Sequence, residues 1–274
     1  MESSRTMAQN RTKNVLRSGG VAFGTLSLLP EPGLPEIVGA AGYDFFVHDT
    51  EHVANDGQHL VHGIRASQAA GVTPIVRVRY VEEKTLLWVL DSGVGGVMVP
   101  MVNDAQTARR AYELTRYPPM GERTLCSATR AAGHGAYRRD FVPFLETAND
   151  EMLVIALLET PEAAANVEQI VREPIEVFIV GRGDISLKMG HRYAPRHPEV
   201  TEVTKRMLDA AMKADKVAGV LAYDVEDARE WIDFGCRFMI YSQPEMILSN
   251  HYIDVLSDLK AAAEARPATV TAAV

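Results

Sequence analysis

Cysteine is scarce in this sequence, with only Cys126 and Cys236 among 274 residues. Two thiols cannot build the framework of several disulfides that small secreted domains use, nor a zinc site made of thiolates. A chain of this length does not need such cross-links, because it can bury roughly 75% of the surface that it exposes when unfolded. The sequence therefore predicts a globular protein held together by its hydrophobic core.

The chain also lacks an excess of basic residues and any long hydrophobic run. It has 28 Lys and Arg against 36 Asp and Glu, a formal net charge of −8, which argues against nucleic acid as a partner. No stretch approaches the roughly 18 consecutive apolar residues of a membrane-spanning helix, so we expect no membrane partner. These absences together predict a soluble, cytoplasmic protein.

The two ends of the chain carry no recognisable chemistry. Residues 1–20 are polar and mildly basic, and we expect a loose or helical leader there. The apolar run 21–29 can imitate a signal peptide, but it ends in Pro30-Glu31-Pro32-Gly33 without a small-residue cleavage pattern, which favours a first β-strand. Residues 267–274 are expected to form a frayed tail. One domain over residues 21–266 remains.

Short apolar runs alternate with longer amphipathic patterns through this domain. The short runs are rich in Val, Ile, Leu or Phe, as are strands buried on both faces of a parallel sheet. Eight such units favour a single (β/α)8 TIM barrel over an open, doubly wound sheet. The expected strands span residues 22–28, 44–49, 74–78, 96–101, 153–159, 176–180, 219–222 and 238–241. The expected helices span residues 35–41, 57–70, 84–91, 105–115, 161–171, 200–214, 225–234 and 244–263.

Residues with special backbone or capping preferences mark the ends of these helices. Glycine adopts the left-handed conformation that ends many helices, and Asp or Thr side chains accept hydrogen bonds from the first N–H groups. The longest stretch without a pattern, residues 117–150, is rich in Gly, Arg and Pro and predicts an irregular connection with a functional or mobile character. The expected caps are Gly42, Gly71, Gly93 and Gly235 at C-termini and Asp104, Thr160 and Asp224 at N-termini.

Polar residues follow several of the expected strands, at the end of a barrel where active sites lie. Two carboxylates, a carboxylate–histidine pair and an arginine therefore converge on one rim, which predicts an enzyme. The residues concerned are Asp49 and His52 after the second strand, Arg77 and Arg79 at the third, Glu159 at the fifth, and Gly181, Arg182, Gly183 and Asp184 after the sixth.

Glu159 and Asp184 offer two hard oxygen ligands from adjacent strands. With water and a chelating substrate they would complete the shell of a divalent metal ion such as Mg²⁺, Mn²⁺ or Co²⁺. The alternative is structural, with Glu159 capping the next helix and Asp184 starting another. The backbone N–H groups of the Gly181-Arg182-Gly183 turn would cradle a carboxylate or phosphate.

Arg77 and His52 have the chemistry of catalytic groups. A guanidinium fixed beside a metal would stabilise an enolate or oxyanion, whereas an ion pair on the rim is the alternative. A histidine held by Asp49 would serve as a general base near neutral pH. Arg79 is expected to point the same way as Arg77, because alternate strand residues share a face. His48 falls inside a strand and is interpreted as structural.

Five short segments are distinctive when taken together. They read Val47-His-Asp-Thr-Glu-His52, Pro74-Ile-Val-Arg77, Met98-Val-Pro-Met101, Arg116-Tyr-Pro-Pro-Met-Gly-Glu-Arg123 and Gly181-Arg-Gly-Asp-Ile-Ser186. In this order they resemble the HpcH/HpaI aldolase family, metal-dependent class II aldolases that use pyruvate. That family includes 4-hydroxy-2-oxoheptanedioate aldolase and 2-keto-3-deoxy sugar-acid aldolases. The resemblance covers residues 24–246, most of the chain.

The resemblance implies a (β/α)8 barrel whose last helix is swapped between the subunits of a homo-oligomer, a hexamer built as a trimer of dimers. It implies a 2-oxo acid such as pyruvate or oxaloacetate as substrate. The residues that match the functional positions of the family are Glu159 and Asp184 for the metal, Arg77 for the enolate, Asp49 and His52 for a catalytic dyad, and Asp91 and Arg123 for substrate binding.

Two positions depart from the family pattern. The family often has a glutamine two residues before the metal glutamate, where this chain has Leu157, and a proline where this chain has Arg182. Losing a polar pocket group and gaining an arginine should change which acid is held, or how. Leu157 is expected to face the metal pocket unless it belongs to the barrel core.

The residues and the resemblance together predict a divalent-metal carbon–carbon lyase, an aldolase that acts on 2-oxo acids through a pyruvate enolate. One alternative keeps the enolate and changes its fate, as in a siderophore-pathway citrate synthase or in macrophomate synthase, which decarboxylates oxaloacetate. Another is a non-catalytic barrel that binds an acidic metabolite. The joint presence of a metal pair, an arginine and a dyad argues against such a binder.

Overall fold

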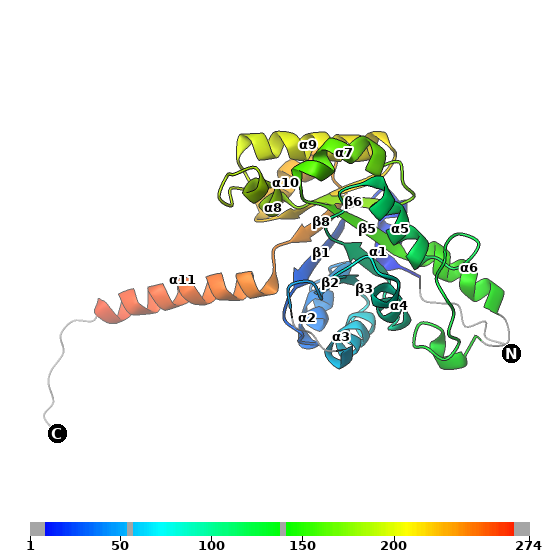
Figure 1. Ribbon diagram of the computed structural model, residues 1–274. Helices are drawn as coiled ribbons and strands as arrows, with labels where there is room; N and C mark the ends of the chain where they lie inside the picture. Colours follow the sequence, from blue (N-terminus) through cyan, green and yellow to red (C-terminus); the bar gives the residue numbers. More distant parts are fainter. Residues whose placement is uncertain (1–8, 54–56, 138–140, 266–274) are drawn as a thin grey trace, which may run out of the picture.

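Eight parallel strands close into a barrel in the computed structural model, which describes residues 9–53, 57–137 and 141–265 (Figure 1). Each strand pairs with the next in sequence, and β1 pairs with β8. This arrangement confirms the predicted (β/α)8 TIM barrel. The strands are β1 (Ala22–Ser27), β2 (Phe45–Asp49), β3 (Thr73–Arg77), β4 (Gly96–Val99), β5 (Leu153–Leu158), β6 (Val177–Val180), β7 (Val217–Ala222) and β8 (Phe238–Tyr241).

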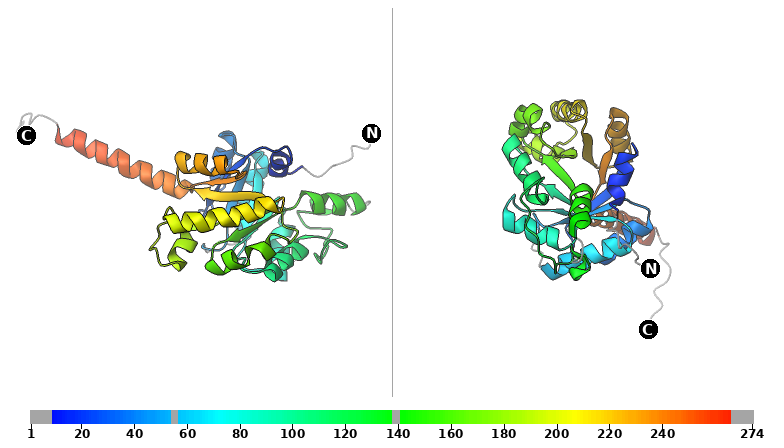
Figure 2. Two further views of the ribbon diagram at one scale, coloured as in Figure 1. Left: turned by 90° about the horizontal axis from the view of Figure 1, so that it is seen from above. Right: turned by 90° about the vertical axis from the view of Figure 1, so that its right-hand side faces the viewer.

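Helices follow the strands and cover the outside of the barrel (Figure 2). Those that the periodicity predicted are α2 (Gly33–Ala40), α3 (Gly57–Ala69), α4 (Glu83–Asp91), α5 (Ala105–Thr115), α7 (Pro161–Ile170), α9 (Pro198–Lys213), α10 (Val225–Phe234) and α11 (Pro244–Glu264). The described residues also contain α1 (Arg11–Arg17), α6 (Phe141–Glu151), α8 (Arg182–Lys188) and a short 3-10 helix, η1 (Gly133–Gly135).

Hydrophobic side chains from the strands fill the interior of the barrel. Phe45 and Phe238 stack with ring centroids 4.3 Å apart. Gly24 on β1 makes room for them, because an added Cβ would lie 2.1 Å from the Phe45 ring. A second hydrophobic layer separates the strands from the surrounding helices. The barrel is thus a packed core rather than a pore, and its chemistry is confined to its ends.

The predicted residues lie at the ends of the helices, with three acting as N-caps and Gly235 as the C-cap of α10. The side chains of Asp104, Thr160 and Asp224 each accept a hydrogen bond from a backbone N–H three residues further on. The four predicted C-cap glycines have positive φ angles, which a residue with a Cβ adopts only under strain. These glycines are Gly42, Gly71, Gly93 and Gly235.

The segment before β1 is helical and packs against the N-terminal end of the barrel. Leu16 of α1 joins the interior core, and the Lys13 ammonium lies 3.1 Å from a Glu176 carboxylate oxygen. The Asn10 side-chain amide donates hydrogen bonds to the backbone oxygens of Gly95 and Glu151. In this region the described residues of the expected leader belong to the barrel and close its N-terminal end. The expected tail, residues 267–274, lies outside the described residues.

Residues 117–150, expected to be irregular, contain most of α6. Phe144 on this helix packs against Tyr117 and Tyr137, with ring centroids 6.1 and 5.0 Å away. Pro143 obscured the helix in the sequence, but it lies in the first turn, where the backbone N–H has no partner within a helix. The expectation of an irregular segment is therefore wrong for its last third.

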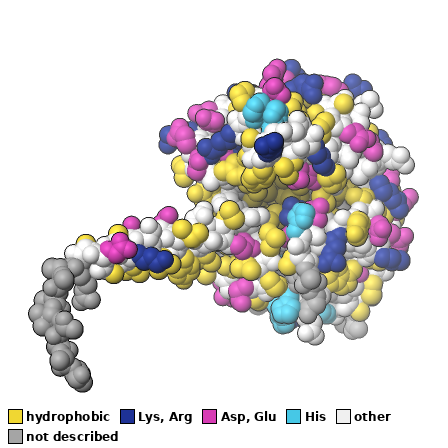
Figure 3. Space-filling view, turned by 60° about the vertical axis from the view of Figure 1, so that its left-hand side comes forward, with side chains coloured by type: hydrophobic (Ala, Val, Ile, Leu, Met, Phe, Trp, Pro, Cys, Tyr) yellow, Lys and Arg dark blue, Asp and Glu magenta, His cyan; other side chains and the backbone are white. Residues whose placement is uncertain are grey.

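The last helix, α11, leaves the barrel after β8 and extends away from it (Figure 1). Pro244 is its single buried residue. Figure 3 shows hydrophobic side chains gathered along this projecting helix. The exposed large hydrophobic residues of α11 are Met246, Ile247, Leu248, Tyr252, Ile253, Val255, Leu256 and Leu259. Among the described residues, no helix has both the length and the hydrophobicity needed to cross a membrane.

Candidate active site

Glu159 follows β5 and is 5% exposed, so its carboxylate sits at the mouth of the barrel with little access to water. The backbone N–H of Met101, after β4, donates a hydrogen bond of 2.8 Å to Glu159 Oε1. Met101 has a φ angle of 54°, in the left-handed region that is uncommon for residues with side chains. Strain of this kind concentrates at functional sites, and here it aims an N–H group at the carboxylate.

Gly181 follows β6 and provides space for the same carboxylate. A Cβ at this position would lie 2.8 Å from Glu159 Cβ and 3.0 Å from Oε2, closer than such atoms approach. The N–H group of Gly181 donates to Leu158 O at 2.9 Å, so it is not free to bind a substrate. Three residues later, Asp184 lies exposed in the first turn of α8.

The pKa of Glu159 is raised to about 7. Burial is the main cause, since it disfavours the charged form, and the nearby charges of Asp184 and Glu51 raise the pKa further. The hydrogen bond from Met101 and the charge of Arg77 act in the opposite direction. Burial also raises the pKa of Glu51, again with a contribution from Asp184. Three carboxyl groups therefore share one small region of negative potential.

The raised pKa of Glu159 makes the stability of the metal-free protein depend on pH. The folded state holds this proton more tightly than the unfolded state, so the stabilising contribution is complete below the ordinary pKa of 4.5 and is lost as pH rises through about 7. The loss corresponds to roughly 3 kcal/mol. We expect urea denaturation with chelator present to show this loss in the wild type and in an exposed control, Glu122→Gln, but not in Glu159→Gln. Parallel pH profiles for all three proteins would contradict it.

Asp49 ends β2 with a fully buried carboxylate that organises its surroundings. Its Oδ1 accepts a 2.7 Å hydrogen bond from Arg77 Nε, and its two oxygens accept the N–H groups of Glu51 and His52, each at 3.0 Å. Burial opposes ionisation, but the Arg77 hydrogen bond and charge, together with these N–H groups, hold the pKa of Asp49 below its ordinary value. Asp49 is thus an anionic anchor for Arg77.

The His52 side chain is 61% exposed, and its Nε2 lies 3.5 Å from Glu51 Oε2. Asp49 accepts the backbone N–H of His52, whereas the imidazole ring lies beside the Glu51 carboxylate. Glu51 also lies 3.4 Å from Arg77 Nε. Glu51 was not predicted as a candidate site residue, because an acid in a loop resembles a solvated surface acid. Its place between Asp49 and His52 was the available signal.

Two neighbouring polar residues are structural. The Arg79 guanidinium donates to the backbone oxygens of Thr50 and Val53, so it holds the loop after β2 and does not point into the mouth as expected. Strand β3 ends at Arg77, and the alternation that placed both arginines on one face stops there. His48 is buried with Nε2 2.9 Å from Ser67 Oγ, and burial lowers its pKa to about 3, in keeping with a structural role.

Arg182 does not reach the mouth of the barrel, contrary to the expectation that it alters how an acid is held. It is 3% exposed and forms a two-point contact with Asp227 on α10, with Nη1 2.9 Å from Oδ1. Its guanidinium also lies 4.9 Å from the Tyr223 ring centroid and 5.0 Å from that of Trp231. The side chain therefore ties the first turn of α8 to α10.

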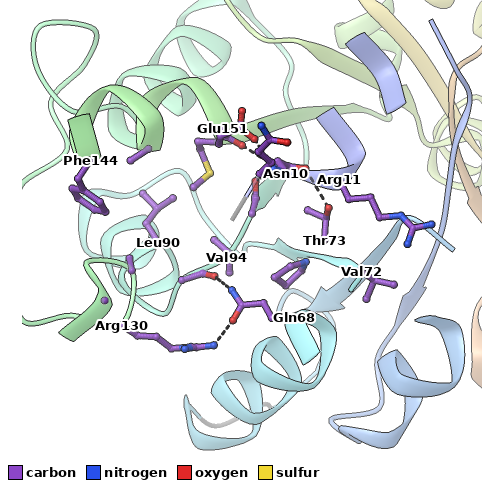
Figure 4. A pocket seen from close by; sticks show the side chains of 18 of the residues that line it. Asn10, Arg11, Gln68, Val72, Thr73, Leu90, Val94, Arg130, Phe144 and Glu151 are labelled. Atoms are coloured by element: carbon purple, nitrogen blue, oxygen red, sulfur yellow. Dashed lines mark hydrogen bonds between the residues drawn. The ribbon is translucent and has the colours of Figure 1, made fainter. Parts of the chain in front are cut away.

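Asp91 and Arg123 lie at the opposite end of the barrel. Asp91 is the last residue of α4, and its Oδ1 is 3.2 Å from Arg123 Nη2. Arg123 is 5% exposed, stacks over the Tyr117 ring at 4.4 Å and lines a cavity of about 400 Å³. Figure 4 shows this cavity with Asn10 and Thr73 beside it, at the N-terminal end of β3. One chain does not bring this pair to Glu159.

Leu157 belongs to the interior core and is 6% exposed. Its Cδ1 would lie 3.3 Å from a Cβ at Gly181, the same position that Glu159 crowds. Leu157 therefore belongs to the barrel core and also lies beside the Glu159 carboxylate. The core and pocket interpretations of this position are compatible.

The family model for HpcH/HpaI aldolase/citrate lyase matches residues 25–241 of this chain. A hydroxypyruvate/pyruvate aldolase from Cupriavidus necator is 33% identical over 244 residues, which cover 89% of this chain and 90% of that protein. A 4-hydroxy-2-oxo-heptane-1,7-dioate aldolase from Shigella sonnei is 31% identical over 233 residues, which cover 84% of this chain and 87% of that protein.

Solved structures are similar over nearly the whole chain. The crystal structure of the citrate synthase SbnG has a TM-score of 0.85 and 30% identity, and the match covers 93% of this chain and 100% of that one. Macrophomate synthase has a TM-score of 0.79 with 93% and 89% coverage, but at 22% identity it supports the fold alone.

Proposed function

We propose that this chain, which belongs to the HpcH/HpaI aldolase/citrate lyase family, forms and cleaves carbon–carbon bonds of 2-oxo acids through a pyruvate enolate. As a member of this family it is an aldolase-type lyase. The observation that carries the proposal is the meeting of Glu159, Asp184 and the anchored Arg77 at one end of the barrel. A cytoplasmic location is part of the proposal, since both cysteines are free.

The residues at the mouth fit a divalent metal ion. Glu159 and Asp184 offer hard carboxylate oxygens, the donors that Mg²⁺ and Mn²⁺ prefer, and Co²⁺ also accepts them. The negative potential that they share with Glu51 is the kind that a dication offsets. When bound, such an ion would act as a Lewis acid that grips a 2-oxo acid and lowers the pKa of its C3 protons.

Arg77 stabilises the enolate in this proposal. Asp49 occupies its Nε, which fixes the plane of the guanidinium and leaves the other N–H groups to donate to an oxygen where charge develops. His52, exposed at the mouth, moves a proton at the aldol hydroxyl or at C3 through water. Backbone N–H groups after Gly181, in the first turn of α8, receive the substrate carboxylate.

Assembly into a homo-oligomer, a hexamer of three dimers, is part of the proposal. The exposed hydrophobic residues of α11 support it, because contiguous apolar surface of this kind marks an interface. A swapped α11 would cover that surface with a second copy of the chain. Asp91 and Arg123 can take part in catalysis only if their end of one barrel faces the mouth of another.

Placing a charge on α11 should therefore disrupt the assembly. We expect Leu256→Glu to reduce the particle mass by at least one assembly step in sedimentation velocity, because the carboxylate would be buried in an apolar interface. The matched control is Asp258→Gln, another exposed position on the same helix. An unchanged mass for Leu256→Glu would contradict the interface.

Two reactions test the proposed function. Purified enzyme with Mg²⁺ or Mn²⁺ should decarboxylate oxaloacetate and should cleave a 4-hydroxy-2-oxo acid to pyruvate and an aldehyde. His52→Ala should slow cleavage more than decarboxylation, because decarboxylation needs no prior removal of a proton. Failure of both reactions would leave an acid-binding barrel and overturn the proposal.

A synthase is the second candidate. The observation that favours it is Leu157 beside Glu159, a departure from the glutamine that the family often has at this position. Decarboxylation without cleavage would select an enolate-using synthase, such as the similar citrate synthase, over an aldolase.

A further inference from the structure

Three possible ligand atoms gather where the connection that follows α8 meets the first turn of α9. One ligand atom each from His191, His197 and Glu199 lie within 4.8 Å of one another. His191 Nε2 is 3.1 Å from Glu199 Oε2, and the two imidazole rings stack with centroids 3.7 Å apart at 19°. This cluster has no part in the proposed lyase chemistry.

The backbone holds the cluster together without a ligand. The His191 N–H donates to Ser186 O at 2.8 Å, which fixes His191 at the end of α8. His197 is the N-cap of α9, where its Nδ1 accepts the N–H of Glu199 at 3.3 Å. Between the histidines, Arg192 and Tyr193 have φ angles of 49° and 61°. These left-handed residues reverse the chain and bring the rings face to face.

We propose that His191, His197 and Glu199 form a second metal site, selective for a late first-row divalent ion such as Zn²⁺ or Ni²⁺. Two imidazoles and one carboxylate are a common ligand set for such ions, and affinity rises toward the end of the row. The oxygen donors of Glu159 and Asp184 favour harder ions, so the two sites would differ in the metal they select.

To bind an ion the cluster must close and the His197 ring must turn out of the stack, because the nitrogen lone pairs of stacked rings lie in nearly parallel planes. Two donors on one zinc ion lie at most about 4.2 Å apart, twice the bond length. The Glu199 side chain is 65% exposed, so it can rotate to close the cluster, while the His191 side chain is 19% exposed and stays fixed. An ion would take the place of the hydrogen bond between His191 and Glu199. The weak 3.3 Å hydrogen bond that His197 Nδ1 accepts would also break.

An ion here would steady the surface behind Asp184. A Cβ at Gly183 would lie 3.0 Å from the Tyr193 ring, so the reversed segment packs directly against the turn that carries Asp184. Joining His191 to the start of α9 closes that segment at both ends. The site is therefore a structural clamp on the connection rather than a place of chemistry.

Metal titration of tag-free, chelator-stripped protein tests the site. Calorimetry is done in a Glu159→Ala/Asp184→Ala background, which removes the oxygen site. We expect one equivalent of Zn²⁺ or Ni²⁺ to bind, and His191→Asn or His197→Asn to weaken it at least about tenfold, the lower limit for losing even an outer-shell partner. His62→Ala, an exposed histidine on α3, should bind as before. Equal binding in all variants, or none in the background protein, would overturn the site.

A thermal readout guards against misfolding. Asparagine is a good N-cap, so His197→Asn should melt like its parent without metal. Zn²⁺ should then raise the melting temperature of the parent and not that of the variant, because an ion that binds the native state alone stabilises it. An equal rise in both proteins would place the ion elsewhere.

Discussion

We expect replacement of Arg77 with lysine to lower turnover at least about a hundredfold, the scale for losing one oxyanion donor. Asp49 takes the Nε–H of Arg77 at 2.7 Å, and the rest of the planar guanidinium stays available for the enolate oxygen. A lysine ammonium is a single point of charge and cannot meet both groups in fixed geometry. Because the contact strengthens as charge develops, kcat should fall by more than KM rises.

The control for this prediction is Arg229→Lys, an exposed arginine paired with Glu226 on α10. Its turnover should match the wild type, since a surface ion pair contributes little. Steady-state kinetics of oxaloacetate decarboxylation measures all three proteins under one metal concentration. A loss of less than tenfold for Arg77→Lys would show that its charge alone suffices and would remove the proposed enolate contact.

We expect removal of the divalent ion to abolish activity, and addition of Mg²⁺, Mn²⁺ or Co²⁺ after chelation to restore it. Glu159→Ala or Asp184→Ala should have the same effect as chelation at ordinary metal concentrations, because these residues provide the proposed charged ligands. Glu122→Ala, which loses an exposed carboxylate paired with Arg110, is the matched control and should keep its activity.

The measurement is turnover after dialysis against a chelator, followed by titration of each ion. Equilibrium dialysis of the same variants shows whether lost activity reflects lost metal. Undiminished turnover in chelated wild-type protein would exclude the metal-assisted enolate from the mechanism.

The fold was predictable because its strands are buried on both faces. Runs such as residues 153–158 and 177–180 are uniformly apolar, and they alternate with amphipathic helices that end at recognisable caps. Two of the additional helices escaped prediction for local reasons. Helix α8 has only seven residues and begins at a glycine turn, so its hydrophobic periodicity is too short to recognise. Pro143 interrupts the helical pattern of α6.

The positions of the candidate site residues were predictable only where the end of a strand determines them. Glu159, Arg77 and Asp49 lie at or directly after strand ends, so the barrel rule places them. The direction of the Arg182 side chain depends on Asp227, 45 residues away in sequence, and no local pattern reveals that contact. In the same way, Met101 contacts Glu159 through its backbone N–H, and the identity of its side chain does not predict that contact.

The buried contact between Arg182 and Asp227 has a consequence for protein engineering. The helix that carries Asp184 begins at a residue held by α10, through Asp227 and the ring of Trp231. Substitutions of Asp227 or Trp231 would move Asp184, a proposed metal ligand, without changing the identity of any ligand residue. A library meant to retune metal preference should therefore include α10, where directed evolution would find solutions that saturation of the mouth alone would miss.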